Sequence, residues 1–172
     1  MKRGRKGVDQ MNLGYTKRLY VLAFDHRGSF QKKMLGIPGA PTPEDAARIS
    51  DAKRVIFEGF QQALADGAPR EPSGMLVDEQ FGGDLARTAK SEGYTFAMPV
   101  EKSGQDEFEY DYGEAFEEHI DAFDPSFTKV LVRYNTEGDQ EMNSRQAARL
   151  KRLSDWLHAN GRKFLFELLV AA

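Results

Sequence analysis

The sequence predicts an α/β fold in which helices cover a parallel sheet. Two observations support this prediction: short apolar runs alternate with longer segments of helical periodicity, and the alternation continues to a fifth strand. Two closures compete. The strands could form the first part of an eight-stranded (β/α)8 barrel, here a partial TIM barrel, which typically needs about 250 residues. The alternative is an open doubly wound parallel sheet, which the length of 172 residues favours.

The first elements are two strands with a helix between them. Residues 19–24 form an apolar run that predicts the first strand. A connection rich in Gly and Pro follows. A helix is predicted after it, because Thr42 is a favourable N-cap and Pro43 suits the first helical position. Its apolar stripe continues at near-helical spacing until Gly67. Residues 75–78 are then predicted to be the second strand.

The remaining elements repeat the same alternation. A shorter helical pattern at 82–92 precedes a third strand at 95–100. Residues 101–124 hold ten carboxylates against one basic residue, and an apolar stripe in the later half of this stretch predicts a helix. A fourth strand at 127–134, a helix that carries the one tryptophan, and a fifth strand at 163–170 complete the pattern.

The charge of the chain divides into two regions. Residues 1–17 carry five basic side chains and one acidic one, and we expect a disordered basic tail there. Residues 18–172 form the folded domain, whose acidic excess disfavours nucleic-acid binding. No apolar run reaches the length of a membrane-spanning helix, and the absence of Cys agrees with a reducing compartment. We therefore expect a cytoplasmic protein that binds neither nucleic acid nor a membrane.

Charged side chains gather where the predicted strands end. Because ligands bind at the carboxyl ends of parallel strands in either closure, these residues are site candidates. They are Asp25, His26, Arg27, Asp78, Glu79, Glu101, Lys102 and Arg133. Simpler roles exist for some of them. Asp78 and Glu79 could cap the following helix, and Glu101 could pair with Lys102 at the surface.

Lys129 and Glu167 differ from these residues because each interrupts an apolar strand. Side chains alternate along a strand, so Lys129 shares one face with Leu131 and Arg133 and points to the barrel interior or the opposite helix layer. An unpaired ammonium would be costly there, and a carboxylate partner is expected, either Glu167 or Asp25. Alternatively, the Lys129 side chain extends to the bottom of the barrel and reaches solvent.

The remaining inventory excludes several chemistries. Without Cys there is no thiolate catalysis, and a site with several His ligands is not expected because two of the three histidines, His119 and His158, lie in helical patterns. We therefore expect no metal. The sequence has no phosphate loop, no nucleophile elbow and no dinucleotide fingerprint. Gly82 and Gly83 open a predicted helix and could admit an anion, which would suit an open five-stranded domain that binds a phosphate-bearing ligand.

Five ordered segments carry a resemblance to a known family. They read Leu-Ala-Phe-Asp-His-Arg-Gly-Ser-Phe at 22–30, Val-Asp-Glu-Gln-Phe-Gly at 77–82, Pro-Val-Glu-Lys-Ser-Gly-Gln-Asp-Glu-Phe at 99–108, Lys-Val-Leu-Val-Arg-Tyr-Asn at 129–135 and Lys-Phe-Leu-Phe-Glu-Leu-Leu-Val at 163–170. Together they resemble the 2-deoxy-5-keto-gluconate 6-phosphate aldolase domain of myo-inositol catabolism. That domain is related to the tagatose-bisphosphate aldolases and is often fused behind a sugar kinase.

The resemblance implies a TIM barrel and a class I aldolase mechanism without metal or cofactor. A lysine amine would attack the ketone of a phosphorylated keto-sugar acid, and cleavage would give dihydroxyacetone phosphate and malonate semialdehyde. By the same resemblance, the catalytic residues are Asp25, Lys129 and Glu167. The substrate-binding residues are expected to be Arg27, Glu101, Lys102 and Arg133. A sugar kinase is an expected associate.

One feature departs from the family pattern. The Schiff-base lysine of the family lies on the sixth strand, whereas the fifth predicted strand is the last in these 172 residues. We therefore expect the amino-terminal part of a longer barrel. Its first and fifth strands would be unpaired edges, which favour a homo-oligomer or pairing with the remaining barrel half. The alternative function is an inactive truncated barrel that acts as a binding or oligomerising module.

Overall fold

The computed structural model describes residues 14–170. Its strands are β1 (Tyr20–Ala23), β2 (Ser73–Leu76), β3 (Thr95–Pro99), β4 (Phe127–Arg133) and β5 (Phe164–Leu169). Its helices are α1 (Pro43–Ala65), α2 (Glu79–Ser91), α3 (Phe116–Phe123) and α4 (Gln140–Ala159), with a short π-helix η1 (Phe30–Met34) and a 3-10 turn η2 (Gly113–Ala115). Most of the predicted basic tail, residues 1–13, lies outside the described residues.

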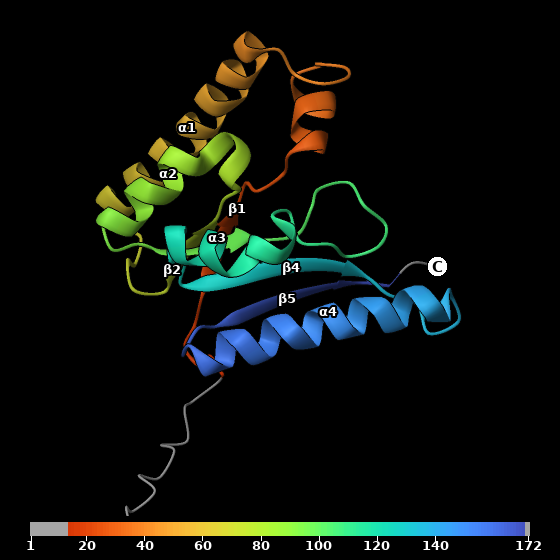
Figure 1. Cartoon of the computed structure of the whole chain (residues 1–172). Coiled ribbons are helices and arrows are strands. Elements are labelled where there is room, and N and C mark those ends of the chain that lie inside the picture. The colour runs from red at the N-terminus through yellow and green to blue at the C-terminus, as the bar shows by residue number, and fades with distance from the viewer. Residues whose placement is uncertain (1–13, 171–172) are drawn as a thin grey trace, which may run out of the picture.

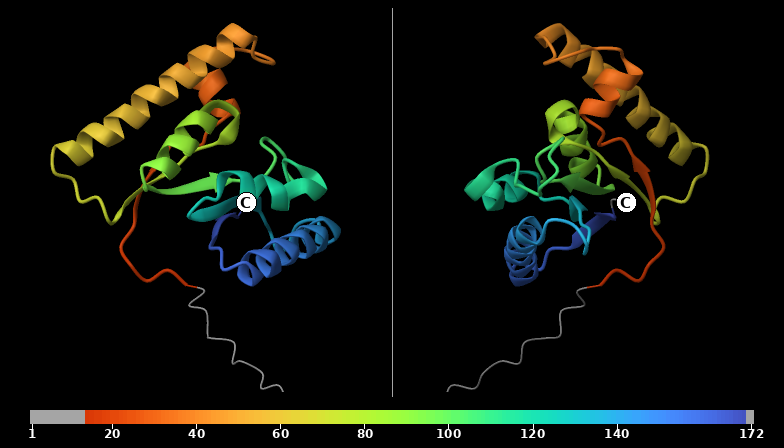
Figure 2. Two further views of the ribbon diagram at one scale, coloured as in Figure 1. Left: turned by 60° about the vertical axis from the view of Figure 1, so that its left-hand side comes forward. Right: turned by 90° about the vertical axis from the view of Figure 1, so that its right-hand side faces the viewer.

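All five strands are parallel and follow one another in the sheet in chain order, β1-β2-β3-β4-β5. The sheet curls into a half-barrel, with the long helices α1 and α4 on its outer side (Figures 1 and 2). This order confirms the partial barrel. The open doubly wound alternative is wrong, because it requires β1 to lie between two other strands, and here β1 is an edge.

Apolar clusters fill the space between the helices and the sheet. One cluster joins α1 and α2 to β2 and β3, with Met75, Leu85 and Phe96 among its buried members. Another joins α3 and α4 to β4, where Val130 and Val132 pack against Leu153. The branched side chains of β4 therefore face the helices, and the alternate side chains face the inside of the half-barrel.

The helix ends follow the capping chemistry of the sequence. Thr42 and Asp45 form a reciprocal capping box at the start of α1. Asp78 caps α2 by accepting a hydrogen bond from the backbone N–H of Phe81, so α2 begins at Glu79 and not at 82. Gly82 packs directly against Val77, which leaves no space for a Cβ. This packing explains the glycine without an anion. Among the helices of residues 14–170, none has the combined length and apolar character that crossing a bilayer needs.

Candidate active site

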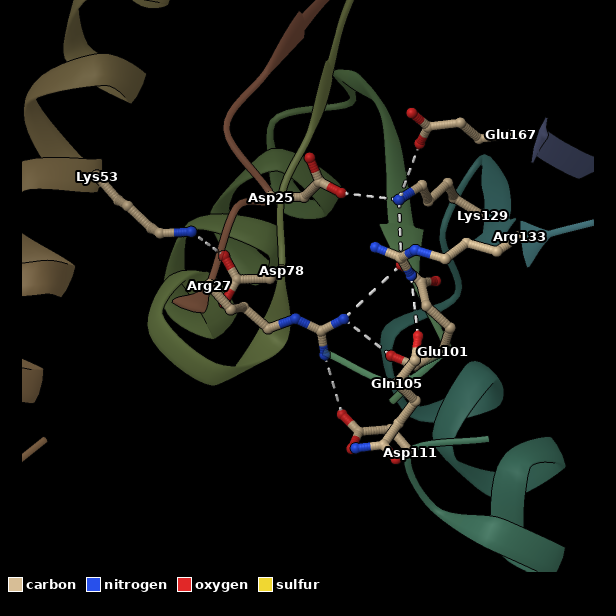
Figure 3. Close-up of polar contacts among 10 residues, drawn as sticks. All are labelled: Asp25, Arg27, Lys53, Asp78, Glu101, Gln105, Asp111, Lys129, Arg133 and Glu167. Atoms are coloured by element: carbon tan, nitrogen blue, oxygen red, sulfur yellow. Dashed lines mark hydrogen bonds and ion pairs between the residues drawn. The ribbon is translucent and has the colours of Figure 1, made fainter. Parts of the chain in front are cut away.

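The amine of Lys129 is the centre of a cluster of charged groups inside the half-barrel (Figure 3). Its Nζ lies 3.0 Å from Asp25 Oδ2, 3.0 Å from Glu101 Oε1 and 3.1 Å from Glu167 Oε2. Lys129 itself is only 2% exposed. The two predicted partners, Asp25 and Glu167, are both confirmed as contacts. The alternative, in which Lys129 extends to solvent, is wrong.

The sheet register explains why these groups meet. Lys129 lies between Pro99 of β3 and Leu165 of β5 in the register, so it is level with the last residue of β3 and with the second residue of β5. Glu167 shares the face of Leu165 because side chains alternate along β5. Asp25 and Glu101 lie two residues beyond the ends of β1 and β3. Carboxylates from or just beyond three strands therefore converge on the amine that β4 carries.

Glu101 does not take the simpler surface role that the sequence also allows. The alternative pairing of Glu101 with Lys102 is wrong, because Glu101 turns inward to Lys129 and is 8% exposed. Lys102 turns outward instead, and its Nζ lies 3.9 Å from Glu109 Oε2. The chain continues the inside–outside alternation of β3 beyond its last residue, so adjacent residues face opposite sides.

The carboxylates determine the protonation of the cluster. Burial alone would lower the pKa of Lys129, but Glu101 and Asp25 attract its charge and accept its hydrogen bonds, so its pKa is raised above the ordinary value. Burial raises the pKa of Glu101, although Lys129 and Arg27 oppose this. Within the described residues, Glu101 Oε2 is buried and has no hydrogen-bond partner. Lys129 therefore stays protonated, and burial disposes Glu101 to hold a proton.

Arg27 closes one side of the cluster. Its guanidinium donates a 2.8 Å hydrogen bond to the backbone carbonyl of Glu101 and a 3.2 Å hydrogen bond to Asp111 Oδ2, and its side chain is 9% exposed. Both acceptors lie on the connection that follows β3. These contacts hold the connection in place. Arg27 therefore has a structural role in addition to its predicted role in substrate binding.

A cavity of about 420 Å³ opens next to the cluster. Its walls include all four predicted substrate-binding residues, namely Arg27, Glu101, Lys102 and Arg133, as well as Asp25 and Lys129. Arg133 does not reach the Lys129 amine and donates a 2.9 Å hydrogen bond to the backbone carbonyl of Gln105. Glu167 does not line this cavity, and it approaches Lys129 from β5. The predicted site residues thus lie together on one side of the half-barrel.

Lys32 and Lys33 also line the cavity and were not predicted. Both lie on η1, in the connection between β1 and α1, where the sequence has no periodicity to orient them. Lysines in a surface connection are common, so the sequence alone does not identify these two as residues of a cavity wall.

Lys53 is a further charged residue that the sequence pattern concealed. It is 0% exposed, and its Nζ donates to the carbonyls of Phe24 at 2.7 Å and His26 at 3.0 Å and to Asp78. Lys53 follows buried Ile49 by four residues on the inner face of α1. The sequence signal for a buried Lys53 is that a charged residue lies on an otherwise apolar helix face. Its contacts fix the backbone on both sides of Asp25.

Metal ligation finds little support in the part of the chain that the structure describes. No group of three or more His, Asp or Glu side chains is arranged to hold an ion among residues 14–170. His119 is buried in a helix and its Nε2 lies 2.5 Å from Glu79 Oε2. The Lys129 ammonium occupies the point where Asp25, Glu101 and Glu167 converge. The arrangement is therefore suited to moving protons and to binding polar groups.

Two comparisons with known proteins bear on this site. A family model matches residues 10–172, and its description reads "Uncharacterized protein conserved in bacteria (DUF2090)". A search of curated proteins found no match. The match spans every residue of the cluster and of the cavity wall, and its description assigns no role to any of them.

Proposed function

The chain belongs to the DUF2090 family of uncharacterized bacterial proteins, and we propose that its pocket serves a class I aldolase-type lyase. The substrate is a phosphorylated keto-sugar acid of the 2-deoxy-5-keto-gluconate 6-phosphate type, and the products are dihydroxyacetone phosphate and malonate semialdehyde. The five sequence segments that resemble such aldolases support this substrate. Four of them contribute residues to the charged cluster or the cavity wall, and the segment at 77–82 contains Asp78, which binds Lys53.

The observation that carries the proposal is the set of three carboxylates around one buried ammonium beside a cavity. Formation and dehydration of a carbinolamine need a group that gives a proton and a group that accepts one, both within hydrogen-bond reach of the substrate. Lys129 and Glu101 hold protons at neutral pH more readily than isolated groups of their kind, and Asp25 and Glu167 are the acceptors next to them. Together these residues can pass a proton in either direction.

Lys129 is not the nucleophile in this proposal. An amine must lose its proton before it attacks a ketone, and the surrounding carboxylates raise the pKa of Lys129. By the resemblance, the Schiff-base lysine comes from a sixth strand, which in a barrel would lie beside β5. Glu167 of β5 is 48% exposed on its side chain, which leaves one side of this carboxylate open to such an amine. The charge of Lys129 would then lower the pKa of that amine.

Borohydride trapping tests the proposed function. The 172-residue chain and the longest natural product of its gene are each incubated with 2-deoxy-5-keto-gluconate 6-phosphate and reduced, and the adduct is located by peptide mass analysis. We expect a covalent adduct on a lysine other than Lys129. The matched Lys129→Met protein should form less adduct at the same substrate concentration. Absence of any adduct from both proteins would refute the Schiff-base mechanism.

A second candidate function is a binding or oligomerising module, and the edges of the sheet favour it. The side chains of Tyr20, Val21 and Leu22 on β1 are exposed, as are those of Phe166, Leu168 and Leu169 on β5. Edge strands with apolar side chains pair readily with other strands. Sedimentation equilibrium combined with turnover assays separates the two candidates. Full turnover by a monomer of the 172-residue chain would eliminate the module as the principal function.

A further inference from the structure

The cavity wall carries more positive than negative charge, in a chain whose net charge is −3. Its cationic side chains are Arg27, Lys32, Lys33, Lys102, Lys129 and Arg133, and its anionic ones are Asp25, Glu101, Asp106 and Glu107. Most of these groups have partners of opposite charge. The groups without such a partner indicate what charge a ligand must carry.

The cations of the inner part of the wall are already neutralised. Lys129 has three carboxylate partners, and Arg27 has Asp111 and Glu101. Glu107 pairs with two arginines of α4. An anionic ligand group placed against Asp25 and Glu101 would be repelled by both carboxylates. The inner part therefore suits a carbonyl or hydroxyl group.

Three cations of the outer part remain without a carboxylate partner within the described residues. Among residues 14–170, Lys32 and Lys33 take part in no ion pair, and Arg133 donates only to the backbone carbonyl of Gln105. Asp106 is the one acidic residue of the wall without an ion pair in the same part of the chain. Three positive charges against one negative charge leave an excess of two.

The connection after β3 adds neutral hydrogen-bond donors. Ser103 and Gly104 line the cavity, and their backbone N–H groups make no hydrogen bond to any other residue from 14 to 170. Gly104 has φ of 75°, a conformation that side-chain-bearing residues rarely adopt. Successive free amides in such a turn form a concavity that binds anions.

We propose that the outer part of this cavity, between Lys32, Lys33 and Arg133, binds a phosphate group of the ligand. A phosphate monoester carries a charge of about −1.5 to −2 at neutral pH, which matches the excess of two, whereas a carboxylate compensates only one. Arg27 does not bind the phosphate, because Glu101 and Asp111 hold it. This inference deepens the proposed function by orienting the substrate, with its phosphate outward and its carbonyl toward Lys129.

Titration with inorganic phosphate tests the inference without any Schiff-base chemistry. Amide chemical shifts of the 15N-labelled 172-residue chain are followed as phosphate or acetate is added at constant ionic strength. We expect saturable shifts in η1 and in residues 103–106, with phosphate binding at least tenfold more tightly than acetate. The Lys32→Gln/Lys33→Gln protein should bind phosphate at least tenfold more weakly.

A matched control separates local from general charge effects. The Lys90→Gln/Lys151→Gln protein loses the same charge from two exposed lysines outside the cavity wall, and its phosphate affinity should stay within twofold of the unchanged chain. The inference is overturned if phosphate causes no saturable shift, if acetate binds as tightly, or if both double variants bind phosphate equally. Borohydride trapping tests the aldolase function, and the titration tests the phosphate site. Either experiment can fail while the other succeeds, so the two proposals are distinguishable.

Discussion

Lys53 and Lys129 are both buried lysines beside the carboxyl end of the sheet, and both bind an aspartate (Figure 3). Their surroundings differ. Lys53 donates to two backbone carbonyls and to Asp78, which supplies one negative charge for its positive one. Lys129 donates to side chains alone, and three carboxylates surround its single charge. Lys53 also lies outside the cavity wall, whereas Lys129 lines it.

The difference is the one expected between a lysine that only holds the fold and a lysine that serves a site. A buried pair whose charges and hydrogen bonds are all matched has no capacity left for a ligand. A cluster with excess negative charge and an adjoining cavity can take up a proton or a polar group, and perturbed pKa values are typical of such sites. The pKa shifts agree: burial lowers the pKa of Lys53, against the attraction of Asp78, whereas the carboxylates outweigh burial at Lys129.

The largest expected effect on stability comes from Lys53→Met. Methionine nearly preserves the volume of the side chain but leaves Asp78 and two carbonyls without their donor. Removing one partner of a buried ion pair costs about 3–5 kcal/mol of unfolding free energy. Urea denaturation would measure this loss. The control Lys151→Met removes an exposed lysine of α4 and should change the free energy by less than about 0.5 kcal/mol. Equal losses in the two proteins would contradict the structural role of Lys53.

Lys129→Met should lower the unfolding free energy less than Lys53→Met does, and it should lower turnover strongly. Water from the cavity can reach the carboxylates that lose their partner, so we expect a loss of about 1–2 kcal/mol in unfolding free energy. Turnover of the keto-sugar acid phosphate by the longest gene product should fall by about 10²–10⁴-fold, the usual contribution of a proton-transfer group. A variant that unfolds as readily as Lys53→Met, with turnover retained, would remove the distinction between the two lysines.

The sequence was sufficient to predict the Lys129 cluster in outline, because it depends on rules that act within a strand. Alternation along β4 separates Lys129 from the valines that face α4, and parallel strands bring Asp25 and Glu167 to the same end of the sheet. The boundaries of β2 were less predictable. Ser73 and Gly74 are poor strand formers, yet pairing with β1 extends the strand to include them.

Three groups depend on contacts that no local pattern records. Glu101 faces inward because β3 continues its alternation past Pro99, although Lys102 is nearer in sequence. Lys53 is buried because its acceptors come from the segments that follow β1 and β2, far along the chain. Lys32 and Lys33 reach the cavity only through the position of η1. In each case the partner lies in another element, and the tertiary fold decides the outcome.

Glu101→Gln refines the comparison by testing where the cluster holds its proton. Burial raises the pKa of Glu101, so the folded chain binds this proton more tightly than the unfolded chain does. The stability of the unchanged protein should therefore fall as pH rises from the ordinary carboxyl range through the raised pKa. The glutamine variant should not show this fall in stability, because its side chain does not titrate. Its side-chain carbonyl can still accept a hydrogen bond from Lys129. Melting temperatures at pH 4.5 and 7 should show the variant gaining relative to the unchanged protein. A constant difference would mean that Glu101 is ionised throughout.

The smallest effect is expected at Glu107, which anchors the cavity connection to α4 through two partly exposed ion pairs. Hydrogen bonds from Arg145 and Arg149 lower the pKa of Glu107 to about 2. Its contribution is therefore complete above the ordinary carboxyl pKa and is lost as pH falls through about 2. Exposed ion pairs contribute little, so Glu107→Gln should lower the melting temperature only slightly at pH 7, and the difference should vanish near pH 2. Phosphate-induced shifts in residues 103–106 should weaken in parallel, because the same connection carries Ser103 and Gly104. If melting is unchanged and those shifts persist, the other contacts of the connection, among them those of Arg27 and Arg133, are sufficient to hold the cavity wall.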